Sequence, residues 1–186
     1  GFVDIDMISA PTELVIIANR YSDPKFIIAD LKAQAEHAQG LAILITNSKS
    51  LAKEVKSQSE DIAGFIILTR NLQQAVDITN KIAPEHLEIL IRNPSRIMKG
   101  IKNAGAIFLG PFSPTAVGDY VAGPSHVLPT CGTARFFSGL SVFDFLKSNH
   151  IISYTKKALE RAKEPLEKIA AIEGLNKHLE SVKIRF

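Results

Sequence analysis

The sequence of 186 residues contains a single cysteine, Cys131, so an internal disulfide is excluded and a reducing compartment is favoured. Its longest apolar runs, such as AGAIFLG and FIIL, have the length of strands and are too short to span a bilayer. No charged and apolar leader ends in a cleavage pattern. We therefore expect a cytoplasmic protein with no membrane partner, in which Cys131 is a small packing residue.

Two nucleotide-binding motifs are also missing. No G-x-G-x-x-G follows a predicted strand, and no phosphate loop of the G-x-x-x-x-G-K-[ST] type is present. An alternating pattern of helices and strands therefore cannot by itself be interpreted as a nucleotide site.

The composition, with 46% hydrophobic and 22% charged residues, is typical of a globular protein and argues against disorder.

Positive charge is concentrated near the C-terminus. Residues 146–186 carry nine Lys and Arg against five Asp and Glu, within an overall net charge of +3. Lys and Glu are mixed along this segment and no aromatic residue is interleaved between Lys156 and Arg185, so a solvated helix face is favoured over a nucleic-acid surface. We expect no nucleic-acid partner.

The first part of the chain alternates apolar strands with amphipathic helices. Expected helices follow at 22–38, where Ser22 or Asp23 is the cap and Pro24 lies in the first turn, and at 71–82, where Asn71 is the cap. Nearly continuous apolar strands separated by such helices predict a mostly parallel α/β sheet covered on both faces. The expected strands are 13–18, 41–46, 64–69, 87–91 and 104–110.

The pattern stops at residue 111. Residues 111–135 are rich in Gly and Pro and lack any period, which indicates a long functional loop. Beyond it, the chain is expected to be helical from about residue 154, with a break at Pro165 and a separation of two segments at Gly174. We expect an α/β domain over 1–145, with the site loop at 111–135, and a helical arm over 146–186.

Gln34 and His37 are three residues apart on an expected helix, so both would project from one face, with Asp30 one turn earlier. An amide oxygen and an imidazole at this spacing can offer two ligands to one metal ion. The alternative is an exposed polar face of an amphipathic helix, and spacing alone favours that alternative.

Glu85 and His86 are adjacent in NKIAPEHLEIL, at a predicted helix-to-strand connection. An imidazole titrates near neutral pH and can relay protons, and a neighbouring carboxylate can tune it or activate water. The alternative is a polar turn. Ligands of parallel sheets usually bind where strands end, whereas this pair enters a strand, which counts against the simplest catalytic interpretation.

Other polar residues lie in the loop and the tail. Asp119 follows a glycine in GDY, where a carboxylate can bind a metal or an ammonium group, and His126 lies in a GPSH turn. The alternatives are an Asx turn and a surface imidazole. Glu173 and His178 flank Gly174 and need not share a helix face, so a solvated helix end is the alternative there.

Together, these segments resemble histidinol dehydrogenases. The resemblance covers essentially all 186 residues and matches only the C-terminal portion of a family chain. The block from Gly105 to Lys147 is its most specific part. The segments that carry it occur in the order DIDMISAPTELVIIAN, DLKAQAEHA, IAPEHLEIL, GAIFLGPFSPTAVGDYVAGPSHVLPTCGTARFFSGLSVFDFLK and IEGLNKHLE.

The resemblance implies a partial Rossmann-like α/β domain with a long active-site loop and a C-terminal helical dimerisation arm. It also implies zinc-dependent, NAD-linked oxidation of L-histidinol through L-histidinal to L-histidine, the last step of histidine biosynthesis. By motif position, His86 would be the general base on the alcohol, and Glu85 would help to activate the water that adds to the aldehyde.

The resemblance further implies binding residues. The implied zinc ligands are Gln34, His37, Asp119 and His178, the last supplied by the second copy in an intertwined homodimer. The implied substrate contacts are Thr12, Gln34, His37, His86, Asp119, His126, Glu173 and His178.

Three features depart from the family pattern. Ala10 stands where a glycine is usual and Thr12 where a serine is usual, and the connection between His37 and Glu85 is shorter than the family norm. The family positions that hold NAD lie before residue 1, which is Gly rather than Met. We therefore expect this chain to carry the zinc and acid–base half of the site, with the NAD surface mostly absent and an N-terminal family half as a further partner. The alternative is a truncated, non-catalytic module that binds zinc and imidazole ligands or another subunit.

Overall fold

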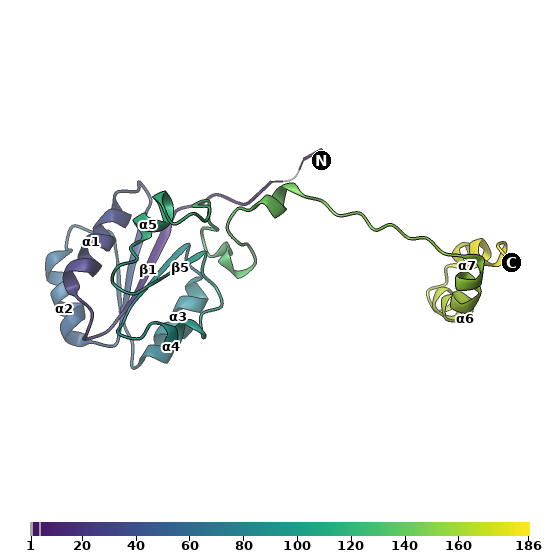
Figure 1. Ribbon diagram of the computed structural model, residues 1–186. Helices are drawn as coiled ribbons and strands as arrows, with labels where there is room; N and C mark the ends of the chain where they lie inside the picture. Colours follow the sequence, from purple (N-terminus) through teal and green to yellow (C-terminus); the bar gives the residue numbers. More distant parts are fainter. Residues whose placement is uncertain (1, 4) are drawn as a thin grey trace. The chain divides into compact units, whose positions relative to one another are not determined.

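A computed structural model describes residues 2–3 and 5–186. Gly1 and Asp4 lie outside the described residues, and the expectation of a missing N-terminal half rested partly on Gly1. The chain divides into two compact units, residues 1–146 and 147–186 (Figure 1). Within the described residues, every helix is too short or too polar to cross a membrane.

The first unit contains a five-stranded parallel sheet in the order β3-β2-β1-β4-β5. The chain runs outward from the central strand β1 to β3 and then returns to β4 beside β1, so the strand order reverses between β1 and β4. This is the expected Rossmann-like α/β arrangement, and the fold prediction is confirmed. The strands are β1 (Glu13–Ala18), β2 (Leu41–Thr46), β3 (Gly64–Leu68), β4 (His86–Leu90) and β5 (Ala106–Leu109).

Helices cover both faces of the sheet (Figure 1). Helices α1 (Pro24–Ala35) and α2 (Lys49–Gln58) pack on one face, where Leu14 and Leu44 are fully buried. Helices α3 (Leu72–Ile82) and α4 (Ser95–Met98) pack on the other face. Each large apolar side chain buried in these layers contributes about 1.5–3 kcal/mol, which explains why the strands are apolar on both sides.

Two predicted helix starts are confirmed. The Asp23 carboxylate accepts a hydrogen bond from the Lys25 N–H, and the Asn71 side chain accepts one from the Gln74 N–H, both at 2.9 Å. Ser22, the other candidate cap of α1, instead donates its hydroxyl to the Leu90 carbonyl. This bond ties the β1–α1 connection to the end of β4.

The expectation of a loop without regular structure at 111–135 is wrong in part. The segment contains α5 (Thr115–Tyr120) and the 3-10 turn η1 (Thr133–Arg135), and η2 (Val142–Phe145) follows. Tertiary contacts stabilise α5, because the Thr115 N–H donates to the buried Glu88 carboxyl and Gly118 packs against the Phe108 ring. A Cβ at position 118 would lie 2.6 Å from that ring, so the close approach requires glycine.

The second unit consists of α6 (Lys156–Ile172) and α7 (Asn176–Lys183). The predicted break at Pro165 is wrong, because this proline lies inside α6. A proline within a helix costs about 3 kcal/mol, and packing of α6 against α7 offsets part of that cost. The predicted separation at Gly174 is confirmed, since this residue adopts a left-handed φ of 70° between the two helices.

Candidate active site

The candidate site lies at the amino edge of the sheet. Thr12 immediately precedes β1, His86 is the first residue of β4, and the register pairs Leu14 with His86. Gln34 belongs to the last turn of α1, which returns the chain to the start of β2. Parallel sheets usually bind ligands at the carboxyl edge. That rule therefore argued against a catalytic role for Glu85 and His86, which the fold places at the amino edge.

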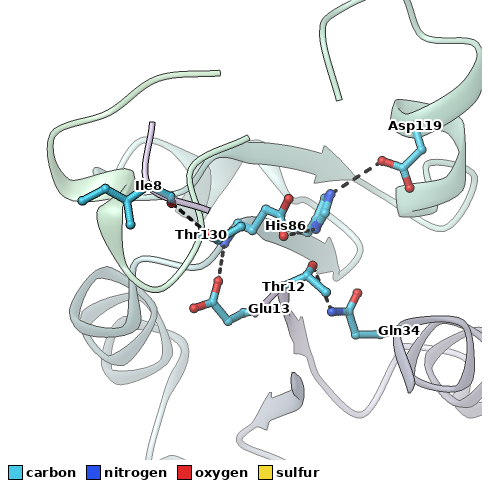
Figure 2. Close-up of polar contacts among 8 residues, drawn as sticks. Ile8, Thr12, Glu13, Gln34, His86, Asp119 and Thr130 are labelled. Atoms are coloured by element: carbon cyan, nitrogen blue, oxygen red, sulfur yellow. Dashed lines mark hydrogen bonds and ion pairs between the residues drawn. The ribbon is translucent and has the colours of Figure 1, made fainter. Parts of the chain in front are cut away.

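His86 is the centre of this cluster. Its Nδ1 lies 3.7 Å from Oε2 of Glu85. Its Nε2 lies 3.7 Å from Oδ1 of Asp119 (Figure 2). The His86 side chain is only 8% exposed, and among the described residues neither ring nitrogen has a hydrogen-bond partner. Buried polar atoms are almost always paired, so these nitrogens indicate a place where a ligand completes the site.

The environment of His86 favours its neutral form. Burial lowers the pKa of the imidazole, and the positive charge of His37 lowers it further, whereas the Asp119 carboxylate opposes both effects. A neutral imidazole with an unpaired nitrogen can accept a proton near neutral pH.

Glu85 has the opposite shift. Burial raises the pKa of this carboxyl to about 7, although a hydrogen bond from the Thr12 side chain lowers it, and the negative charges of Glu13 and Asp119 raise it again. Its Oε2 is buried and has no hydrogen-bond partner among the described residues. Glu85 can therefore gain or lose a proton at neutral pH.

Thr12 connects Glu85 to helix α1. The Gln34 Nε2 donates to the Thr12 Oγ1 at 3.2 Å (Figure 2), and this leaves the amide oxygen of Gln34 for another partner. The predicted helix over 22–38 is too long at its C-terminal end, because α1 ends at Ala35 and His37 lies in the turn that follows. That turn nevertheless keeps the His37 charge close enough to act on His86.

The donor set fits a zinc ion by its chemistry. Within the described part of the chain, no three His, Cys, Asp or Glu side chains form a group that could hold a metal. The implied ligand set contains only two such residues from one copy of the first unit, His37 and Asp119, together with the Gln34 amide. Nitrogen and oxygen donors suit zinc, and Asp119 and His37 both act electrostatically on the same buried imidazole.

The remaining predicted residues fall into two groups. Asp119 lies on α5 rather than in an Asx turn, and together with His126 it lines a cavity of about 740 Å³. Glu173 and His178 both line a cavity of about 460 Å³ in the second unit, although each is exposed. Asp119 and His126 thus line one cavity, and Glu173 and His178 line another.

The prediction that Cys131 is a packing residue is wrong, because its side chain is exposed. Its backbone has a φ of 53°, and the N–H groups of Cys131 and Gly132 donate to the buried Glu13 carboxyl. Glu13 also accepts from the Glu85 N–H at 3.4 Å. Glu13 therefore joins the loop after β5 to the segment that carries Glu85 and His86.

Three carboxyl groups were not predicted as site residues: Glu13 and Glu88, which are buried, and Asp30, which is half-buried. A signal existed for Glu88, which is the only charged residue inside the strand segment LEILI. Because both faces of a parallel sheet are covered, a carboxyl in such a strand is buried and needs a partner. For Asp30, the position one turn before Gln34 was the available signal.

The fold and the site define a Rossmann-like α/β domain with a buried Glu–His pair at the amino edge of its parallel sheet. Comparison with known proteins gives the family. The model of the histidinol dehydrogenase family matches residues 1–186. The chain belongs to the histidinol dehydrogenase family.

Individual relatives agree with this assignment. Histidinol dehydrogenases from Clostridium acetobutylicum and Caldanaerobacter subterraneus are 48% and 49% identical, and each match covers 100% of this chain and 47% of the relative. The crystal structure of histidinol dehydrogenase from Elizabethkingia anophelis matches with a TM-score of 0.90 at 34% identity, covering 98% of this chain and 46% of that one. This chain therefore spans about half the length of the relatives it matches. The alignments extend over 203 positions, so the relatives contain residues without a counterpart among these 186.

Proposed function

We propose that this chain carries the zinc-binding and acid–base part of a histidinol dehydrogenase, which oxidises L-histidinol through L-histidinal to L-histidine with NAD as co-substrate. Family membership supports the reaction class. The single observation that carries the proposal is His86, a buried imidazole between Glu85 and Asp119 whose nitrogens have no hydrogen-bond partner among the described residues.

In this proposal His86 is the general base. Its lowered pKa keeps the imidazole neutral, so it can take the hydroxyl proton of histidinol as a hydride leaves the carbinol carbon for NAD⁺. Glu85 in its ionised form then removes a proton from the water that adds to the aldehyde. A pKa of about 7 allows Glu85 to accept that proton and release it again. The second hydride passes from the hydrated aldehyde to a second NAD⁺ as a hydroxyl proton leaves, and the resulting acid ionises to the carboxylate.

Zinc, when bound, would orient the amine and imidazole of the substrate and polarise the oxygen at the reacting carbon. We assign Gln34, His37 and Asp119 of one copy and His178 of a second copy as its ligands. Thr12, His86, His126 and Glu173 complete the proposed substrate contacts. Thr12 would act by orienting the Gln34 amide, to which it is hydrogen-bonded.

We further propose a cytoplasmic homodimer in which the second unit supplies Glu173 and His178 to the neighbouring site. Exposed apolar side chains support a protein partner, because monomers rarely leave so many uncovered. Those between residues 142 and 154 are Val142, Phe143, Phe145, Leu146, Ile151, Ile152 and Tyr154. A helical arm is a simple way to deliver a ligand into a second copy.

The dinucleotide surface is proposed to lie outside these 186 residues, in an N-terminal family half. A second candidate function is a non-catalytic module that binds zinc, imidazole ligands or another subunit.

One assay separates these functions. The chain is incubated with histidinol, zinc and NAD⁺, with and without an N-terminal family polypeptide, and NADH is followed by absorbance. We expect turnover only when that polypeptide is added. Turnover by the chain alone would contradict the proposed location of the NAD surface, and zinc retention without turnover in either mixture would favour the module. The His86→Gln variant is the control for a reaction at this site.

A further inference from the structure

Glu88 occupies an unusual position for a carboxyl group. It lies in the middle of β4 and is 0% exposed, with Ile16 and Phe108 as its neighbours on the adjoining strands. Because side chains alternate along a strand, Glu88 points to the same face as His86 and Leu90. Leu90 packs in the layer under α1 and α2, so Glu88 also lies beneath α1.

Two elements meet at this carboxyl. Its Oε1 accepts a hydrogen bond at 3.0 Å from the N–H of Thr115, the first residue of α5. The Asp30 side chain on α1 is within hydrogen-bonding reach of it. Asp119 follows Thr115 by one turn of α5, and Gln34 follows Asp30 by one turn of α1. Glu88 therefore contacts both helices one turn away from proposed zinc ligands.

A contact between two carboxyl groups is favourable only if one of them keeps a proton. Burial and the nearby Asp30 charge raise the pKa of Glu88 to about 8, so Glu88 holds the proton at neutral pH. Protonated Glu88 can donate to Asp30 while Oε1 accepts from Thr115. Its Oε2 is buried and has no hydrogen-bond partner among the described residues, and a proton on this atom would allow it to donate.

We propose that Glu88 is a positioning residue, which joins α1 and α5 through β4 and thereby sets the separation of the ligands Gln34 and Asp119 on either side of His86. This inference rests on the proposed zinc site for its effect on metal binding. The link between the helices is independent of zinc. Glu88 acts through these helices and does not contact substrate or metal.

The test compares two variants of the whole chain. Glu88→Gln keeps an oxygen that accepts from Thr115 and gains an amide that donates to Asp30, so it reproduces the protonated carboxyl. Glu88→Leu keeps a similar volume but removes both hydrogen bonds. Thermal unfolding of each variant verifies that it folds before further comparison.

The first measurement is amide hydrogen exchange in the absence of zinc. In Glu88→Leu, exchange in the peptide that covers α5 should be roughly tenfold faster or more, the scale of one lost buried hydrogen bond. Exchange in α2, which supplies neither of the partners described for Glu88, should be unchanged. Glu88→Gln should match the unaltered chain in both segments. Unchanged exchange in α5 of Glu88→Leu would overturn the proposal.

The second measurement is zinc affinity by titration. Glu88→Leu should bind zinc about 10–100-fold more weakly, as is typical when a residue that orients a ligand is lost, and Glu88→Gln should restore the affinity. Equal losses in both variants would show that the amide cannot replace the carboxyl and would overturn the proposal. If the unaltered chain binds no zinc, the proposed ligand set fails, and the exchange measurement still decides the role of Glu88.

Discussion

The Nε2 atom of His86 lies 3.7 Å from the Asp119 carboxylate, although the two residues come from the first position of β4 and the last turn of α5. The distance exceeds a hydrogen bond, so the nitrogen remains available to a ligand. The carboxylate opposes the fall in the His86 pKa that burial causes. In the proposed site, Asp119 is therefore assigned two roles, as a zinc ligand and as the carboxylate that moderates the pKa of His86.

Replacing His86 by Gln should separate catalysis from metal binding. Glutamine keeps a polar side chain of similar size but cannot accept the substrate proton as a base. We expect turnover of the completed enzyme to fall about 10²–10⁴-fold, with zinc content unchanged. Steady-state kinetics and metal analysis on the same preparation measure both quantities. An undiminished rate would exclude His86 as the base.

Replacing His37 by Ala should abolish zinc retention. A direct ligand contributes more than an outer partner, whose loss alone weakens metal binding roughly 10–100-fold. Metal analysis after gel filtration gives the zinc content. His150→Ala is the matched control, because His150 is exposed and belongs to no proposed ligand set. Equal zinc in the two variants would remove His37 from the ligand assignment.

Gly118→Ala should displace α5. Alanine normally stabilises a helix by about 0.5–1 kcal/mol relative to glycine, but its Cβ would lie 2.6 Å from the Phe108 ring. Overpacking of this kind costs about 1–3 kcal/mol, so we expect net destabilisation and weaker zinc binding. Urea denaturation and zinc titration measure these effects.

Two controls accompany the Gly118 variant. Ala116→Ser changes an exposed residue of the same helix and should alter neither quantity. Adding Phe108→Leu to Gly118→Ala should recover part of the lost stability, since it removes the ring that the new methyl group meets. A Gly118→Ala chain as stable as the original would show that Phe108 yields without cost.

Glu88 should make stability fall as pH rises. The folded state keeps the Glu88 proton up to about pH 8, beside Asp30 from α1 and the Thr115 N–H from α5, whereas an ordinary glutamate releases its proton at 4.5. The folded state therefore binds more protons between these values, and the free energy of unfolding decreases with pH across that window. Glu88→Gln removes this contribution, so its stability should fall less between about pH 5 and pH 8.

Urea denaturation at both pH values measures this difference. Glu85, with a pKa of about 7, adds a decrease of the same sign in every variant that retains it. The exposed replacement Glu54→Gln on α2 should behave as the original chain does. Parallel pH dependences for Glu88→Gln and the original chain would contradict the assignment of the proton to Glu88.

The strands of the sheet could be predicted from the sequence because each one depends on residues that are close together in the chain. β1 and β2 begin and end at the expected residues, since each is a continuous apolar run bounded by polar residues and turn formers. Asp23 and Asn71 were predictable as caps for the same reason, because a cap bonds to a backbone N–H within three residues.

Helix α5 could not be predicted in this way. Its sequence TAVGDY lacks an apolar period, and its contacts come from Glu88 and Phe108, which are distant in sequence. The end of α1 before His37 was likewise missed, since helix ends are among the least certain features of a local pattern.

The amino-acid sequence by itself determined the order of strands and helices, the two-sided burial of the sheet and the residue types that a proton-transfer and metal site requires. Only the tertiary structure decided that β4 returns beside β1, and hence that Thr12, Gln34, His86 and Asp119 meet at the amino edge. The physical reason is the distance along the chain over which each kind of interaction acts. Periodicity and capping act over a few residues, whereas the pKa of a carboxyl or imidazole depends on burial and on charges brought close by distant parts of the chain.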